Sequence, residues 1–167
     1  MDKNAVLFHG IPMSDAWEII LEGRALLAGG GRLHTKGSHG IPQRLRSIFL
    51  KRIDAAIPVS LTTQAAIEAP SEETAIEHLV PMKRIAIVII DPAAHDPRTG
   101  GSDAEMLGPA IDIKHAEEIA RTLIVKARVT KAEHAKLNSA QPSFQWDAPG
   151  ADGFARYRAA GIELFEV

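Results

Sequence analysis

One apolar run stands out in the chain: Arg84-Ile85-Ala86-Ile87-Val88-Ile89-Ile90, followed directly by Asp91-Pro92. An unbroken apolar run of this length predicts a strand that is buried on both of its faces. Asp91-Pro92 is typical of a chain turn and predicts the end of the strand. The run is the strongest strand prediction in the sequence.

Several shorter elements are expected on the N-terminal side of this run. Ser14 is the expected N-cap of a helix, and Gly29-Gly30-Gly31 is expected to end that helix. The other predicted elements are a strand over 5–8, a basic loop over 32–42, an amphipathic segment over 43–53, a strand over 57–63 and a short helix over 74–79.

The C-terminal side predicts an exposed loop followed by alternating short elements. They are the loop over 93–102, helices over 115–120, 131–137 and 153–160, and strands over 122–130 and 162–167. Helices and short strands interleave without a regular βαβ repeat, so we expect the α+β class. A chain of 167 residues is the size of one ordinary domain, and we expect a single domain over 1–167.

The composition excludes several classes of protein. Apolar residues make up 46% and charged residues 24% of the chain, which is typical of a globular domain and not of a disordered one. The formal net charge of −2 gives no overall attraction to nucleic acid or to an anionic membrane. Without cysteine, the chain has no disulfide, no thiolate nucleophile and no cysteine-ligated zinc.

The sequence also limits the expected location of the protein. No apolar run approaches the length of a membrane span, and the N-terminal run before His9 is too short for a signal-peptide core. We therefore expect a cytoplasmic protein, or one that a specialised secretion system delivers into a target cytoplasm. No membrane partner is expected.

Two patterns of polar residues are candidates for ligand binding. His9 follows the first predicted strand, where an imidazole can hydrogen-bond a ribose hydroxyl or can serve a purely structural purpose. Ser60, Thr62 and Thr63 lie at the end of a predicted strand. Their hydroxyls can bind a polar ligand, although threonine also favours strands because it is β-branched.

A pair of carboxylates forms the third candidate. Asp103 and Glu105 are two residues apart, so both would point to the same side of an extended backbone. Two like charges at this spacing repel each other. Functional sites tolerate that cost, and exposure to solvent avoids it. The pair is therefore either a catalytic site or a solvated surface feature.

The order of these patterns is more informative than any one of them. In order, they are a strand ending in Phe8-His9-Gly10, a helix with Ile19-Ile20-Leu21-Glu22-Gly23, the strand Val59-Ser60-Leu61-Thr62-Thr63, and Asp103-x-Glu105 followed by Gly108-Pro109-x-Ile111. This order resembles the ADP-ribosyltransferase superfamily, over about three quarters of the chain. The resemblance implies two small packed, mainly antiparallel sheets flanked by helices.

The resemblance implies a role for each matching residue in binding NAD⁺. His9 matches the histidine that contacts the adenosine ribose, and Gly10 matches the glycine that lets the nicotinamide amide approach the backbone. Ser60 and Thr62 match the Ser-x-Thr element that supports the catalytic glutamate and the NAD⁺ site. The chain departs from the family in two ways. The histidine and the Ser-x-Thr element belong to different branches of the family. The only tyrosine, Tyr157, lies far downstream of the position at which the family has the central tyrosine that stacks on nicotinamide.

The resemblance also implies the catalytic residues. Glu105 matches the glutamate that stabilises the oxocarbenium-like transition state as nicotinamide departs. Asp103 matches the position that helps to select the acceptor, which the family fills with Gln or Glu. Arg32 and His34, in the basic loop, are candidates to bind the pyrophosphate of NAD⁺, although the pattern favours a basic surface loop without such a function.

The predicted function is mono-ADP-ribosyl transfer of the bacterial toxin or effector type, with NAD⁺ as substrate and a macromolecular acceptor that we expect to be a protein. An inhibitor or immunity protein is a possible further partner. Two alternatives stay open: an RNA 2′-phosphotransferase-like enzyme, suggested by Arg32-x-His34, and a non-enzymatic protein-binding module. A metal site is not expected, because the seven histidines are scattered along the chain.

Overall fold

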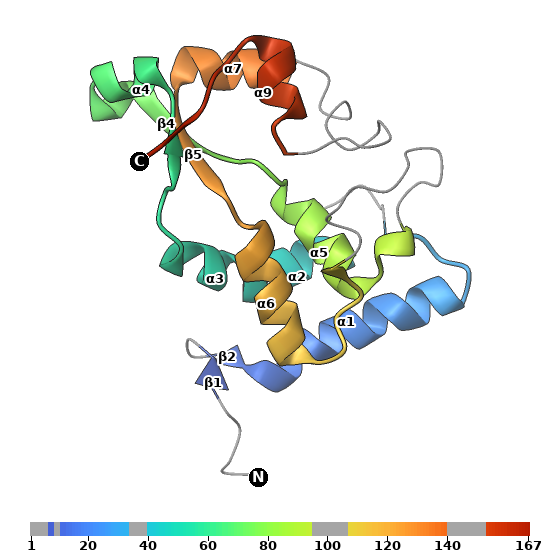
Figure 1. Ribbon diagram of the computed structural model, residues 1–167. Coiled ribbons are helices and arrows are strands. Elements are labelled where there is room, and N and C mark those ends of the chain that lie inside the picture. The colour runs from blue at the N-terminus through green and yellow to red at the C-terminus, as the bar shows by residue number, and fades with distance from the viewer. Residues whose placement is uncertain (1–6, 9–10, 34–39, 95–106, 140–152) are drawn as a thin grey trace. The chain divides into compact units, whose positions relative to one another are not determined.

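The computed structural model describes residues 7–8, 11–33, 40–94, 107–139 and 153–167 (Figure 1). The chain forms two compact units. The described part of the first unit comprises residues 7–8, 11–33, 40–57, 82–94 and 107–123, and that of the second comprises 58–81, 124–139 and 153–167. The expectation of a single domain stays a prediction.

The first unit is mainly helical. Its helices and helical turns are α1 (Met13–Ala28), α2 (Ile41–Leu45), the π-helical turn η1 (Arg46–Leu50), α3 (Lys51–Ala56), α5 (Met82–Ile90), the 3₁₀ turn η3 (Pro92–Ala94) and α6 (Ile113–Leu123). Two short strands, β1 (Leu7–Phe8) and β2 (Ile11–Pro12), pair antiparallel. The predicted amphipathic segment over 43–53 is confirmed as helical, with Leu45, Phe49, Leu50 and Ile53 buried.

The strongest strand prediction is wrong, because the apolar run over 84–90 forms helix α5. Eight of the nine residues of α5 are buried, and α1, α2, η1 and α6 all contact it. A helix that is surrounded by other helices is apolar on every side, so its sequence has the same unbroken pattern as a buried strand. The helical neighbours offer no strand for the run to pair with, and this tertiary context outweighs the strand preference of isoleucine and valine.

An arginine from α1 holds the C-terminal end of α5. The Arg24 Nε donates to Ile90 O at 2.8 Å, and its Nη2 donates to Ala110 O at 2.5 Å and to Ile89 O at 3.3 Å. The last carbonyls of a helix have no partner within the helix, and the guanidinium supplies one. The same guanidinium lies 5.4 Å from the centre of the Trp17 ring.

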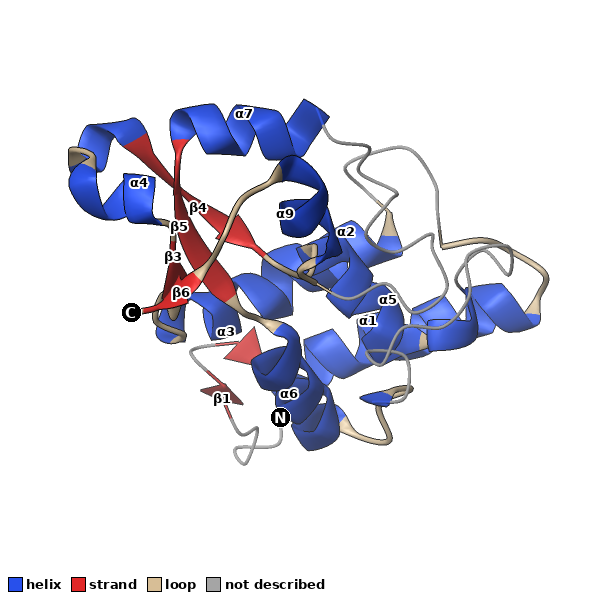
Figure 2. Ribbon diagram, turned by 45° about the horizontal axis from the view of Figure 1, so that its top comes forward, coloured by secondary structure: helices blue, strands red, loops and turns tan. Residues whose placement is uncertain are grey.

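The second unit contains a four-stranded mixed sheet in the order β4-β5-β3-β6 (Figure 2). The strands are β3 (Leu61–Thr62), β4 (Thr74–His78), β5 (Lys126–Thr130) and β6 (Phe165–Glu166). Strand β5 pairs antiparallel with β4 and parallel with β3, and β6 pairs antiparallel with β3. The helices and helical turns are α4 (Gln64–Glu68), the 3₁₀ turn η2 (Ser71–Glu73), α7 (Lys131–Ser139) and α9 (Ala155–Ala160).

The prediction of a helix over 74–79 is also wrong, because this segment forms strand β4. The segment pairs with β5 along all five of its residues, from Thr74 opposite Thr130 to His78 opposite Lys126. Glu77 is buried while its neighbour Ile76 is 45% exposed, which is the two-residue alternation of a strand. The pairing partner, β5, lies about fifty residues away in the sequence, so no local pattern indicates that the two segments pair.

Helices α7 and α9 cover one face of this sheet (Figure 2). The core between the sheet and the helices is apolar and comprises Leu79, Ala127, Val129, Leu137, Tyr157, Ala160 and Ile162. The predicted helices over 115–120, 131–137 and 153–160 are confirmed as α6, α7 and α9. The α+β class is also confirmed: the described residues form one four-stranded mixed sheet, one separate two-stranded ladder and several helices.

Candidate functional site

The structure describes three of the eight predicted site residues. The other five, Glu105, Asp103, His9, Gly10 and His34, lie outside the described residues. The three described residues are Arg32 in the first unit, and Ser60 and Thr62 in the second.

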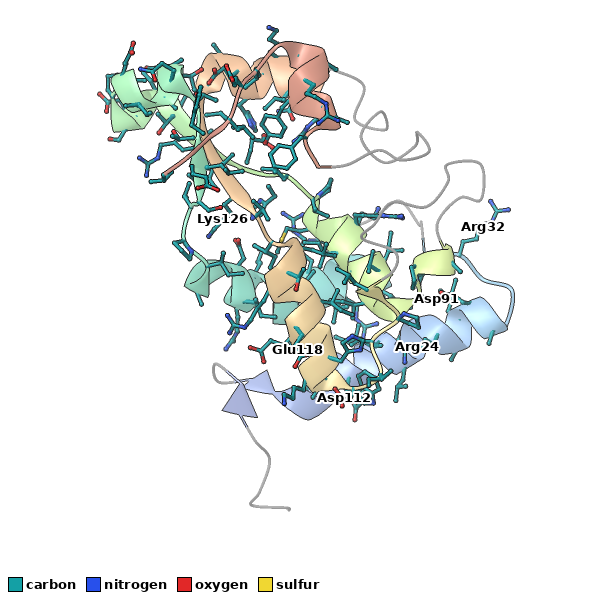
Figure 3. The ribbon with its side chains drawn as sticks, viewed as in Figure 1. Arg24, Arg32, Asp91, Asp112, Glu118 and Lys126 are labelled. Atoms are coloured by element: carbon teal, nitrogen blue, oxygen red, sulfur yellow. The ribbon has the colours of Figure 1, made fainter. Side chains whose placement is uncertain are left out.

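Arg32 follows the glycine turn that ends α1. Gly30 has a φ of +80°, a conformation that favours glycine, and Gly31 N donates to Leu26 O at 2.9 Å, so the turn is tightly closed. Arg32 is exposed, and its side chain points outward from this loop (Figure 3). Such a residue is accessible to an anionic ligand.

Ser60 and Thr62 belong to the central part of the sheet but differ in accessibility. Ser60 is exposed, and its backbone is tied to both neighbouring strands, since its N donates to Lys126 O at 3.1 Å and its O accepts from Val167 N at 3.0 Å. Thr62 is only 6% exposed, and its hydroxyl donates a long bond of 3.4 Å to Thr63 O. The Ser60 hydroxyl is therefore the one of the two that a ligand can reach.

Both residues lie on the sheet face opposite α7 and α9. The strand register places Ile76, Arg128, Thr62 and Phe165 in one row across the four strands, and His78, Lys126 and Ser60 in the next. Arg128 is exposed between buried Ala127 and Val129, so its side chain points away from the core. We call these seven residues the open sheet face: Ser60, Thr62, Ile76, His78, Lys126, Arg128 and Phe165.

The open sheet face is basic and partly apolar. Lys126 and Arg128 are its lysine and its arginine, and no residue of the two rows is an aspartate or a glutamate. Phe165 is 42% exposed, which places an aromatic ring at the surface two strands away from Arg128. Figure 3 labels Lys126 at the start of β5. A basic surface beside an exposed aromatic ring and a free hydroxyl suits a ligand that has both anionic and planar parts.

Sequence reasoning identified Ser60 and Thr62 but missed Arg128, Lys126 and Phe165. The signal for the two cations is their spacing, since Lys126-Ala127-Arg128 places both on one side of a strand. Phe165 had no comparable signal. Its place beside the other residues follows from the pairing of β6 with β3, which joins segments about one hundred residues apart.

The opposite face of the sheet contains a buried ionic cluster. The Arg156 Nη2 donates to Glu77 Oε2 at 2.9 Å, and the His134 Nδ1 contacts Glu77 Oε1. Burial, and next the negative charge of Glu77, raise the pKa of Tyr157 to about 12. Because Glu77, Arg156 and Tyr157 are each at most 8% exposed, this cluster holds α9 to the sheet and is closed to a substrate.

A shallow hollow of about 330 Å³ lies beside α9. Its lining comprises Phe154, Tyr157, Arg158, Gly161, Ile162, Glu163 and Leu164. No residue of the open sheet face belongs to this lining, so the hollow is separate from that face.

Among the residues that the structure describes, no cluster of three or more His, Asp or Glu side chains is arranged to hold a metal ion. None of the described helices combines the length and apolar character needed to cross a membrane.

Comparison with known proteins adds no assignment: no protein-family model, curated protein or solved structure matches this chain. The resemblance to ADP-ribosyltransferases therefore stays a prediction from the sequence motifs.

Proposed function

We propose that this chain is an NAD⁺-dependent mono-ADP-ribosyltransferase of the toxin or effector type, with Glu105 as its catalytic carboxylate. The observation that carries the proposal is the order of four motifs along the chain, from His9-Gly10 through Ser60-x-Thr62 to Asp103-x-Glu105 and Gly108-Pro109. The finer fold that goes with it, two small packed sheets flanked by helices, is part of the same proposal.

In the proposed reaction, the bond between the nicotinamide nitrogen and the ribose carbon breaks. Nicotinamide leaves with the electron pair, which neutralises its ring, and positive charge develops on the ribose. The Glu105 carboxylate stabilises this oxocarbenium-like state electrostatically. A nucleophile of the acceptor then bonds to the same carbon and releases a proton to solvent. Asp103 helps to select that acceptor.

Features of the described structure support the binding of NAD⁺. Ser60, one of the two residues of the Ser-x-Thr element, presents an exposed hydroxyl next to the basic side chains of β5. The pyrophosphate of NAD⁺ is anionic, and lysine and arginine are its usual protein partners. In the first unit, Arg32 is exposed after the turn at Gly30 and is by itself accessible to an anion.

The proposal is tested by incubating the full chain with NAD⁺ labelled in its adenylate part and with cell lysate. We expect the wild type to transfer label to a macromolecule and Glu105→Gln to lose that transfer. Glu118→Gln, which changes an exposed glutamate on α6, is the matched control and should transfer label normally. If neither the wild type nor the control transfers label, the proposal is wrong.

A second experiment, with a 2′-phosphorylated RNA as substrate, separates the proposal from the 2′-phosphotransferase alternative. That alternative depends on Arg32 and His34 and needs no glutamate, so Arg32→Ala would abolish turnover of a 2′-phosphorylated RNA while Glu105→Gln would leave it intact. A non-enzymatic protein-binding module would have no affinity for NAD⁺. A ligand present at about 100 times its dissociation constant stabilises the fold by about 2.7 kcal/mol, which a thermal-shift titration detects.

A further inference from the structure

We infer that the open sheet face is a nucleotide-binding surface, on which Arg128 and Lys126 bind phosphate and Phe165 stacks on the base. The inference rests on the proposed function in one respect: ADP is the part of NAD⁺ that this surface would hold. Of the residues that it uses, only Ser60 and Thr62 belong to the sequence motifs.

The phosphate end of the surface is formed by β5. Arg128 is exposed, and the burial of Ala127 and Val129 on either side fixes the direction of its side chain. Among the described residues no carboxylate forms an ion pair with Arg128. A guanidinium can bind phosphate through two parallel hydrogen bonds. Lys126 points to the same side, about 7 Å away along the strand, so that both cations can reach one diphosphate.

The base end of the surface is formed by β6. Phe165 lies in the same cross-strand row as Arg128, with Thr62 of β3 between them. Neighbouring strands are about 4.8 Å apart, so the two positions are separated by about 10 Å. A nucleotide extends over a similar length from phosphate to base. An exposed aromatic ring is a stacking surface for any base.

The middle of the surface suits a ribose. Thr62 is buried and forms the floor, while the exposed Ser60 offers a hydroxyl from the adjacent row. The two cations suit the charged phosphates of a nucleotide, and the hydroxyl of Ser60 suits its ribose. A nucleic acid would need a longer basic track, and an acidic peptide would leave the exposed ring of Phe165 without a planar partner. The surface therefore favours a mononucleotide.

The test is isothermal titration calorimetry of the full chain with ADP. We expect Arg128→Ala and Phe165→Ala each to weaken binding by about tenfold to a hundredfold, because each removes a charge-assisted hydrogen bond or a stacking contact. Two variants serve as matched controls. Phe154→Ala removes a ring that is 43% exposed, against 42% for Phe165, and Lys136→Ala removes an exposed cation from α7. Neither control should change the affinity, and circular dichroism checks that all four variants fold.

Two smaller probes assign the ends of the site. Inorganic pyrophosphate should bind more weakly to Arg128→Ala but normally to Phe165→Ala, and adenosine should show the reverse. The inference is overturned if the wild type does not bind ADP at millimolar concentration, or if all four variants bind ADP as the wild type does.

The two proposals can fail separately. In one case, label transfer from NAD⁺ depends on Glu105, but the KM of the enzyme for NAD⁺ is the same in Arg128→Ala and Phe165→Ala as in the wild type. The inference of a nucleotide surface is then wrong, and the proposed function stands. If ADP binds as predicted but no label is ever transferred, the surface stands and the proposed function is wrong.

Discussion

Glu77 on β4 and Arg156 on α9 lie 79 positions apart in the sequence and form a buried ion pair with a distance of 2.9 Å. Both side chains are only 10% exposed. The pair joins an edge strand of the sheet to the helix that packs on it. Its position behind the open sheet face makes it a structural support and not a ligand site.

Breaking this pair should destabilise the second unit strongly. Arg156→Met leaves the Glu77 carboxylate buried without its main counter-charge, and we expect the free energy of unfolding to fall by about 3 kcal/mol. Glu117→Gln breaks the more exposed pair between Glu117 and Arg121 on α6 and should cost less than about 0.5 kcal/mol. Urea denaturation measures both changes, and equal losses would contradict this view of the cluster.

Tyr157 should make the protein less stable at high pH. Burial, and then the charge of Glu77, raise its pKa from 10.0 to about 12. The unfolded chain therefore ionises first. The stabilisation is complete below pH 10 and is lost as the pH rises to about 12, by about 2–3 kcal/mol in all.

This shift is directly measurable because Tyr157 is the only tyrosine in the chain. Its tyrosinate absorbance should appear about two pH units later in the folded protein than in the urea-unfolded protein. Tyr157→Phe should remove this part of the decline in stability between pH 10 and 12. A normal titration in the folded state would show that the phenol is not buried.

Gly108→Ala should destabilise the first unit. A Cβ at this position would overlap the backbone oxygen of Val88, which belongs to helix α5 and cannot move aside. We expect the free energy of unfolding to fall by about 1–3 kcal/mol. At Gly29 a Cβ would meet only the carbonyl oxygens of Ala25 and Leu26 at 3.5 Å, so Gly29→Ala is the matched control and should be tolerated. Thermal denaturation compares the two variants, and equal melting temperatures would be the contrary result.

The sequence predicts the amphipathic helices well and fails where tertiary contacts decide. The segment over 43–53 was predicted as amphipathic and is helical, and the helices predicted over 115–120 and 131–137 are confirmed as α6 and α7. Helix α5 was predicted as a strand because burial on all sides removes that contrast. Strand β4 was predicted as a helix because its partner β5 is distant in the sequence.

The candidate site shows the same difference between local patterns, which the sequence reveals, and tertiary contacts, which it does not. Ser60 and Thr62 were found from a local motif, and the structure places Thr62 in β3 and Ser60 directly before it. Arg128 and Phe165 join Thr62 only through the pairing of three strands, which no local pattern specifies. Residues that a fold brings together from distant segments are the part of a site that sequence motifs miss.

The most direct measurement of the central claim is the rate of nicotinamide release from NAD⁺ in the presence of lysate, compared between Glu105→Gln and Glu118→Gln. We predict that Glu105→Gln lowers the rate by about a hundredfold or more, because the carboxylate acts in the transition state, and that Glu118→Gln leaves the rate unchanged. Release by Glu105→Gln at the wild-type rate would contradict the account.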